Sequence, residues 1–434
     1  MESINSRGNS NLSEVILTDR HYINKIEQLK GFMNYIENSP RPPRQNFFML
    51  IRPRGFGLSL ANEAIEAIYS RDEVLLDNID IKSANGLNID NLGHYCVLHF
   101  SFSKVKATTY NEIVKVLYDA LQSLIWEHHV KIKTDTGKDL RMQMLQLIKE
   151  ITDREQKQLV VLFDNYDVPI MLMSRLENDQ ERQNCLSLYF EMLNAFRQAG
   201  DRVKFCLLTG HVKFSLSSNI SEGLPHVIDL SFNDISAALT GFSIDEIKQT
   251  YGEDLARIAP QQGITVAEYL DCLEKCYGGY VFSDKQNKVL CPYSVTRALD
   301  NDGELYAYNA DNNYTFLQAA LAKEKPDLSW LIEKDGQDQL LLEEVSINPE
   351  GKEFGPLLVQ QGIFSINKVT YADREHSLSW RYRYGFANVE MRRIFQILTG
   401  ISHPSLRDLP INTRVFDAGE EEYLIKADPS TSNT

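Results

Sequence analysis

Apolar runs alternate with amphipathic segments along the first half of the chain. Four apolar runs have the length and composition of buried strands: FFMLI (47–51), CVLHFSFS (96–103), QLVVLFDNYD (158–167) and VKFCLLTGHV (203–212). Apolar residues at helical spacing predict helices near 20–40, 59–71, 108–130, 138–153 and 180–199. A further short strand is expected at 226–232. Strands that alternate with helices predict a mostly parallel sheet with helices on both faces.

The pattern changes after residue 233. Residues 234–300 combine short helical segments with turns, and the less regular region beyond them contains a helix near 315–322, a strand within 361–371 and a helix at 387–399. We therefore expect five regions: a disordered N-terminus (1–19), an α/β domain (20–233), a small helical lid domain (234–310), a mixed α/β C-terminal domain (311–415) and a flexible acidic tail (416–434).

Charge and cysteine content narrow the class of protein. The 434 residues carry a net charge of −15, and this acidic balance argues against a broad nucleic-acid-binding surface. No apolar stretch is long enough for a transmembrane helix, and the N-terminus lacks the apolar core of a secretory signal, so we expect a soluble cytoplasmic protein. Six cysteines are too few for a disulfide framework, and Cys272 and Cys276 are interpreted as packing residues rather than zinc ligands.

The segment RPRGFG (52–57), between the first strand and the following helix, has the position of a phosphate-binding loop. Such a loop has the form G-x-x-x-x-G-K-[ST]. Its glycines let backbone N–H groups surround a phosphate, its lysine neutralises phosphate charge and its hydroxyl binds Mg²⁺. Aligned on Gly57, this chain has Arg52 at the first glycine position, Leu58 at the lysine position and Ser59 at the hydroxyl position. The lysine is therefore absent.

Two arginines of this turn are candidates for phosphate binding in place of the lysine. A guanidinium group can hold a phosphate through two parallel hydrogen bonds, so Arg52 and Arg54 are candidate ligands together with the backbone of Gly55 and Gly57. The alternative is that both arginines are surface charges. Ser59 is either an Mg²⁺ ligand or the N-cap of the helix that follows.

Polar residues also follow the two later strands. Asp164 ends the run LVVLFD, where the acidic residue of such a site holds Mg²⁺, and Asn165 takes the position of a glutamate that would activate water. An amide cannot act as a general base. Thr209 lies at the tip of the next strand, where a polar residue can sense a γ-phosphate.

Three further residues near these strand ends are candidates because ligands of open α/β sheets bind at the carboxyl edge of the strands. Asp167 is either a catalytic residue or the cap of the turn before Pro169. His211 is a candidate catalytic residue, and Lys213 is a candidate phosphate contact.

Four segments resemble, in order and spacing, the AAA-ATPase-like domain family of uncharacterised bacterial proteins. RPRGFGLSL, VVLFDNYDVPI, FCLLTGHVKFS and YGGYVFSDKQNKVLCPYS are similar to the family's RPRRFGKSL, DEYDKPI, TGVSKFS and NGYRF…NPFS. The resemblance covers about residues 20–300 and extends through YGFANVEMRRIF (384–395). It implies a P-loop NTPase-like α/β fold, ATP and Mg²⁺ as ligands, and nucleotide contacts at Arg54, Gly57, Ser59, Asp164, Asp167 and Thr209.

The chain departs from this family at two positions and at its end. The family's lysine and glutamate fall on Leu58 and Asn165. Members usually end in a restriction-endonuclease-like nuclease domain, but the last part of this chain has no D…(D/E)-x-K signature. Removing one charged group that stabilises a transition state commonly costs roughly 3–4 kcal/mol, so the loss of both groups predicts a slow ATPase close to background.

These observations lead to three hypotheses. The first is a pseudo-ATPase with weak or no nucleotide binding, which acts through a protein partner and is a candidate bacterial effector translocated into a host cell. The second is an active ATPase or phosphoryl-transfer or nucleotidyl-transfer enzyme, in which Arg54 or Lys213 replaces the lysine and Asp167 or His211 replaces the glutamate, with Asp164 retained. The third, a nucleic-acid-processing protein, is disfavoured by the acidic charge. A glutamate run, Glu420–Glu422, also resembles an export signal.

Overall fold

The computed structural model describes residues 22–38, 46–72, 94–103, 105–132, 139–214, 227–285, 287–312, 314–326, 354–374 and 377–400, together with residues 12 and 15. The side chains of residues 311 and 368–383 are outside this description. The predicted acidic tail lies outside the described residues, and the predicted disordered N-terminus lies outside them except at residues 12 and 15.

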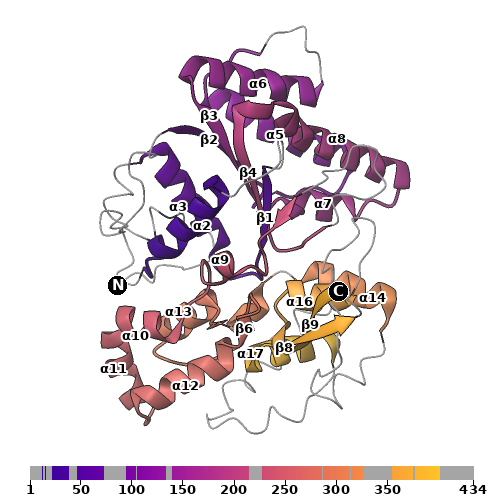
Figure 1. Cartoon of the computed structure of the whole chain (residues 1–434). Coiled ribbons are helices and arrows are strands. Elements are labelled where there is room, and N and C mark those ends of the chain that lie inside the picture. The colour runs from indigo at the N-terminus through magenta and orange to yellow at the C-terminus, as the bar shows by residue number, and fades with distance from the viewer. Residues whose placement is uncertain are drawn as a thin grey trace, which may run out of the picture.

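A five-stranded parallel sheet forms the centre of the first half of the chain (Figure 1). Its strands are β1 (Phe47–Ile51), β2 (Tyr95–Ser101), β3 (Gln158–Asp164), β4 (Val203–Gly210) and β5 (Ile228–Asp229). They lie in the order β2-β3-β4-β1-β5, and every pairing is parallel. The predicted α/β fold with a parallel sheet is therefore confirmed. The predicted strand at 226–232 shortens to the two residues of β5.

Helices cover both faces of this sheet, as Figure 1 shows. On one face, α2 (Ile26–Asn38) and α3 (Leu58–Ser70) pack against Phe48, Leu50 and the side chains of β3 and β4 that point to the same face. The opposite face packs against α5 (Tyr110–Glu127), α6 (Leu140–Glu155), α7 (Asp167–Met173) and α8 (Asp179–Gln198). Each strand thus buries side chains on both faces, as its continuous apolar run predicts.

The second half of the chain forms two further groups of elements below the sheet in Figure 1. Helices α9 (Asp234–Ala237), α10 (Ile244–Thr250), α11 (Gly252–Gln261), α12 (Val266–Tyr277) and α13 (Pro292–Asp300) come first, and α10 to α13 share their own apolar core. A pair of short strands, β6 (Tyr280–Val281) and β7 (Lys288–Val289), lies between α12 and α13.

The remaining elements are the 3₁₀ helix η5 (Tyr308–Asp311), α14 (Thr315–Glu324), α16 (Phe354–Gln360), the hairpin β8 (Phe364–Arg374) and β9 (Ser377–Phe386), and α17 (Val389–Thr399). Side chains of α14, α16 and α17 belong to the same apolar cluster as the second face of the sheet. The end of the described chain is therefore packed onto the α/β core. The sequence did not predict α7, β6, β7 or α16, because each is too short to show a period.

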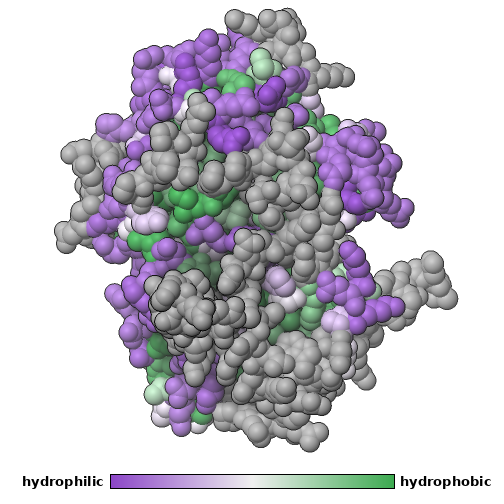
Figure 2. Space-filling view, turned by 45° about the vertical axis from the view of Figure 1, so that its right-hand side comes forward, coloured by the Kyte–Doolittle hydropathy of each residue, from purple (hydrophilic) through white to green (hydrophobic). Residues whose placement is uncertain are grey.

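The described surface over the flanking helices is largely hydrophilic (Figure 2). Among the described helices, none has both the length and the apolar character needed to cross a membrane. Trp126 on α5 is the most exposed large apolar side chain of the described residues, with 79% of its surface exposed.

Candidate functional site at the carboxyl edge of the sheet

The Asp164 carboxylate is the centre of a hydrogen-bonded group at the end of β3. Its Oδ2 accepts hydrogen bonds from Ser59 Oγ at 2.9 Å and from Asn165 Nδ2 at 3.1 Å. Its Oδ1 accepts one from Asn62 Nδ2 at 3.2 Å. Burial raises the pKa of Asp164, whereas the hydrogen bond from Ser59 and the charge of His99 oppose that shift. The structure thus brings together the two residues predicted to bind a metal, Ser59 and Asp164.

Thr209 joins the same group because β4 lies between β1 and β3. Its position in β4 is directly opposite Asp164 in the sheet register. Its Oγ1 accepts a hydrogen bond from Asn62 Nδ2 at 2.5 Å and donates one to the Phe163 carbonyl at 3.1 Å. Thr209 therefore lies between β1, which leads into the turn at residues 52–57, and Asp164 at the end of β3. A residue that senses a γ-phosphate would occupy this position.

The turn has the glycine and the helix start of a phosphate-binding loop but not the lysine. Gly57 has φ 76° and precedes α3, and a Cβ atom built there would have no neighbour within 4 Å. The amide groups of residues 54–57 donate no hydrogen bond to any described part of the chain. Free amides at a helix N-terminus attract anions. Leu58 is 5% exposed and packs in the apolar cluster between α2, α3 and the sheet.

The Arg52 side chain is buried and makes hydrogen bonds within the protein, so it is not a surface charge. Its guanidinium is fully buried, and Nε donates to Thr240 Oγ1 at 3.0 Å. Nη1 donates to the carbonyls of Ile51 and Ser231, and Nη2 donates to the carbonyl and the hydroxyl of Ser236. All five N–H donors of Arg52 are thereby engaged. The structure gives Arg52 no donor for a phosphate, in contrast to the prediction.

Arg54 and Asp167 attract each other on the other side of the loop. Arg54 is half-buried, and among the described residues its Nε has no hydrogen-bond acceptor. Asp167 is fully buried in the first turn of α7, where its Oδ2 accepts from the amides of His211 at 3.0 Å and Val212 at 2.9 Å. Asp167 therefore fixes the chain that leaves β4. Of the two arginines, Arg54 remains available to a ligand.

His211 and Lys213 are placed in structural contacts rather than beside Asp164. The Nδ1 of His211 lies 2.9 Å from the carbonyl of Arg52 and donates to it. Burial lowers the pKa of His211 to about 3, so its ring is neutral near pH 7. Lys213 forms an ion pair with Asp229 of β5 at 2.7 Å. Neither side chain contacts the Asp164 group in the described structure.

The sequence did not predict three further residues of this site: Asn62, Glu66 and His99. His99 Nδ1 lies 2.6 Å from Glu66 Oε2, and within the described residues its Nε2 has no partner. Burial lowers the pKa of His99, but the hydrogen bond to Glu66 and the charges of Glu66 and Asp164 outweigh it, so the net shift is upward. Asn62 and Glu66 follow Leu58 at intervals of four residues. This helical spacing places them on the same face of the helix and could have identified them as candidates from the sequence.

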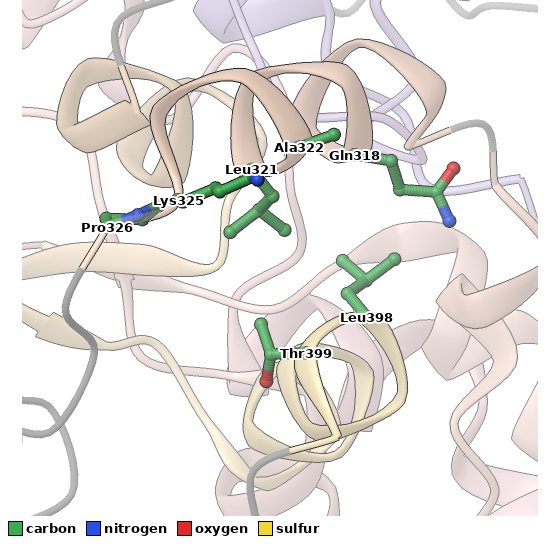
Figure 3. A pocket seen from close by; sticks show the side chains of 7 residues that line it. All are labelled: Gln318, Leu321, Ala322, Lys325, Pro326, Leu398 and Thr399. Carbon is green, nitrogen blue, oxygen red and sulfur yellow. The ribbon is translucent and has the colours of Figure 1, made fainter.

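A separate cavity of about 360 Å³ lies between α14 and α17 (Figure 3). Its lining comprises Gln318, Leu321, Ala322, Lys325, Pro326, Leu398 and Thr399. Leu321 and Leu398 face the same space from the two helices. None of the predicted site residues lines this cavity, so it is not part of the group around Asp164.

Asp167 gives a testable pH dependence. Burial raises the pKa of this carboxyl from 3.8 to about 6, although the charge of Arg54 opposes the shift. Its contribution to stability is therefore complete below pH 3.8 and decreases as the pH rises to about 6. Between pH 4 and 6, we expect wild type to lose about 2 kcal/mol of unfolding free energy relative to Asp167→Asn. Urea unfolding across this range measures the difference, and parallel curves for the two proteins would contradict it.

The parallel sheet, the glycine turn before α3 and the carboxylate at the end of β3 are the arrangement of a P-loop NTPase-like protein. Residues 8–220 match the model of the AAA-ATPase-like family, described as predicted AAA-ATPase. The resemblance noted in the sequence is confirmed over this segment.

One relative is similar to part of this chain. The chain is 26% identical over 210 residues to an uncharacterised protein in the vnfD 5′ region of Azotobacter chroococcum mcd 1. The match covers 48% of this chain and 38% of that protein, so this chain spans about two fifths of its relative's length.

Proposed function

We propose that the chain is a degenerate AAA-ATPase-like protein that binds nucleotide weakly through the loop backbone, hydrolyses it slowly or not at all, and acts through a protein partner. The observation that carries this proposal is the placement of Leu58. In a working phosphate-binding loop this position supplies a cation to the β- and γ-phosphates, whereas here it supplies an apolar side chain to the core.

The Asn165 amide supports the same proposal. Asn165 has a left-handed backbone with φ 56°, and its side-chain Nδ2 donates a hydrogen bond to Asp164. An amide in this position cannot take a proton from an attacking water. The residues that remain fit a phosphate and Mg²⁺ in part. Free amides of 54–57 would bind phosphate oxygens, and Ser59 Oγ and the Asp164 carboxylate would supply oxygen ligands to the metal. When bound, Mg²⁺ would neutralise phosphate charge.

A second candidate function is supported by the His99–Glu66 pair. Asp167 and His211 make internal contacts, so neither is a good replacement for the missing glutamate. His99 instead has an unpartnered Nε2 within the described structure and a carboxylate on Nδ1, which is the arrangement of an oriented base. If the chain hydrolyses nucleotide, His99 is the residue we would assign to water activation.

The role of a protein partner rests on the loss of the two charged groups, because a scaffold without turnover can act only through binding. The glutamate run proposed as an export signal lies outside the described residues. Translocation into a host cell remains a proposal from the sequence.

Calorimetric titration with ATP, with and without Mg²⁺, tests the proposal. We expect wild-type binding weaker than about 100 μM and turnover at background, since the lysine cation is missing. Asp164→Ala should remove any Mg²⁺-dependent part of the heat. Asp153→Ala, an exposed aspartate on α6 that contacts Arg202, is the matched control and should leave it unchanged. Micromolar, Mg²⁺-dependent binding with turnover lost in His99→Ala would establish the second candidate and reject the first.

A further inference from the structure

Glu390 is a buried carboxyl group in the first turn of α17. It is 0% exposed, and its Oε1 and Oε2 lie 3.0 and 2.9 Å from Ser294 Oγ. The amide of Asn309 donates to Oε1 at 2.9 Å. The carboxyl thus contacts α13 and η5 from a residue about ninety positions further along the chain.

The same contacts continue to the phosphate-loop turn. Asn309 Nδ2 donates to Cys291 Sγ at 3.2 Å, and Cys291 Sγ lies 3.6 Å from the Gly55 carbonyl. The Tyr293 amide donates to that carbonyl at 3.1 Å. We call Glu390, Ser294, Asn309 and Cys291 the Glu390 network. It connects α17 to the backbone of the turn through side-chain and main-chain hydrogen bonds.

The turn also fits closely against this network. Gly55 has φ 84°, and a Cβ atom there would lie 2.9 Å from Tyr293 Cβ and 3.1 Å from Cys291 Sγ. Phe56, which is 2% exposed, packs edge-on against Tyr280 and Phe282 with ring centroids 4.8 and 5.3 Å away. A change in the position of α13 or η5 would therefore alter the contacts of the turn at residues 52–57.

No described cation pairs with the Glu390 carboxylate. The titratable groups that interact with it electrostatically are Cys276 and Tyr277 of α12, Tyr280 of β6, Cys291 and Tyr314. All of them are neutral near pH 7, because burial raises their pKa values further. Burial likewise raises the pKa of Glu390 to about 8, although the hydrogen bonds from Asn309 and Ser294 oppose the shift.

The N-terminus of α17 favours a negative charge at this position, but the burial effect is larger. A helix dipole contributes about 0.3–1 kcal/mol to a nearby charge, whereas an unpaired buried charge costs several kcal/mol. The neutral carboxylic acid is buried without this cost and can still accept the hydrogen bond from Ser294 Oγ. Ser294 and Asn309 can donate to the ionised carboxylate as well, so the two protonation states differ in the cost of burying a charge that has no described cation beside it.

We propose that Glu390 is a proton-controlled contact that holds α17 and the phosphate-loop turn together while the carboxyl is neutral and loosens both when it ionises. This goes beyond the proposed function, because it requires no nucleotide. A carboxyl whose pKa is raised in the folded state stabilises most below its ordinary value of 4.5 and loses that contribution as the pH rises to about 8. The loosening should therefore increase with pH up to about 8.

Hydrogen–deuterium exchange of the full chain at pH 6.5 and pH 9 tests the proposal, with rates corrected for intrinsic exchange. In wild type, we expect exchange in peptides that cover residues 52–57 and 389–399 to be about thirtyfold faster at pH 9, because pH 6.5 lies about 1.5 units below the pKa of about 8. Glu390→Gln retains the hydrogen-bonding shape without ionising, so its corrected rates should be equal at both pH values. Peptides of β2 serve as the internal control.

Two results would overturn this coupling. One is an equal pH response in wild type and Glu390→Gln. The other is a wild-type response confined to 389–399 with none at 52–57. Ser294→Ala is the second variant, because it breaks the network without removing the carboxyl. It should speed exchange at 52–57 at both pH values, and unchanged exchange there would also reject the coupling.

Discussion

Arg52→Ala is expected to lower the free energy of unfolding by at least about 3 kcal/mol. The substitution would leave buried acceptors of Ile51, Ser231, Ser236 and Thr240 without their donor, and each unsatisfied buried group costs about 1–3 kcal/mol. It would also remove the guanidinium that lies 4.2 Å above the Phe282 ring. Urea unfolding followed by circular dichroism measures the change.

Arg54→Ala is the matched control, since it removes the same side chain from the same turn. Arg54 is half-buried and forms no ion pair within the described residues, so we expect its loss to change the free energy of unfolding by less than about 1 kcal/mol. ATP binding should respond in the opposite order, with Arg54→Ala the more damaging of the two where both variants fold. An Arg52→Ala protein of wild-type stability that had lost only nucleotide binding would show that Arg52 contacts phosphate after all.

Gly279→Ala is expected to destabilise the protein by more than Gly57→Ala, although both glycines have a left-handed backbone. Their φ values are 78° and 76°, so the intrinsic cost of about 1–2 kcal/mol is common to both. A Cβ at Gly279 would lie 2.1 Å from the Ala387 carbonyl oxygen, whereas one at Gly57 meets nothing within 4 Å. The chain before α17 would have to move, and we expect an added loss of about 2 kcal/mol or more.

Thermal and urea unfolding of the two alanine variants isolates this steric effect from the shared backbone cost. The segment that would move includes Asn388, which donates to the Gly278 carbonyl at 2.8 Å and caps α17. Gly279→Ala should therefore also speed hydrogen exchange in 389–399, and Gly57→Ala should not. Equal destabilisation by the two substitutions would mean that the close approach of Ala387 is relieved at no cost.

The sequence by itself determined the elements of the α/β half and the chemical losses at the site. Apolar runs and helical spacing are local properties, so they placed β1 to β4 and the long helices to within a few residues. The identity of Leu58 and Asn165 is likewise written in the sequence, and it needs no structure to show that a cation and a base are missing. The parallel order of the strands then made Ser59, Asp164 and Thr209 neighbours, as expected.

The tertiary structure alone decided what the remaining polar residues do. Arg52 pairs with residues about 180 positions away, and Glu390 pairs with Ser294 across about a hundred. The local spacing of apolar and polar residues in the sequence does not indicate contacts between residues so far apart. Whether an arginine binds a ligand or a carbonyl, and whether a glutamate is charged or neutral, depends on burial and partners that only folding supplies.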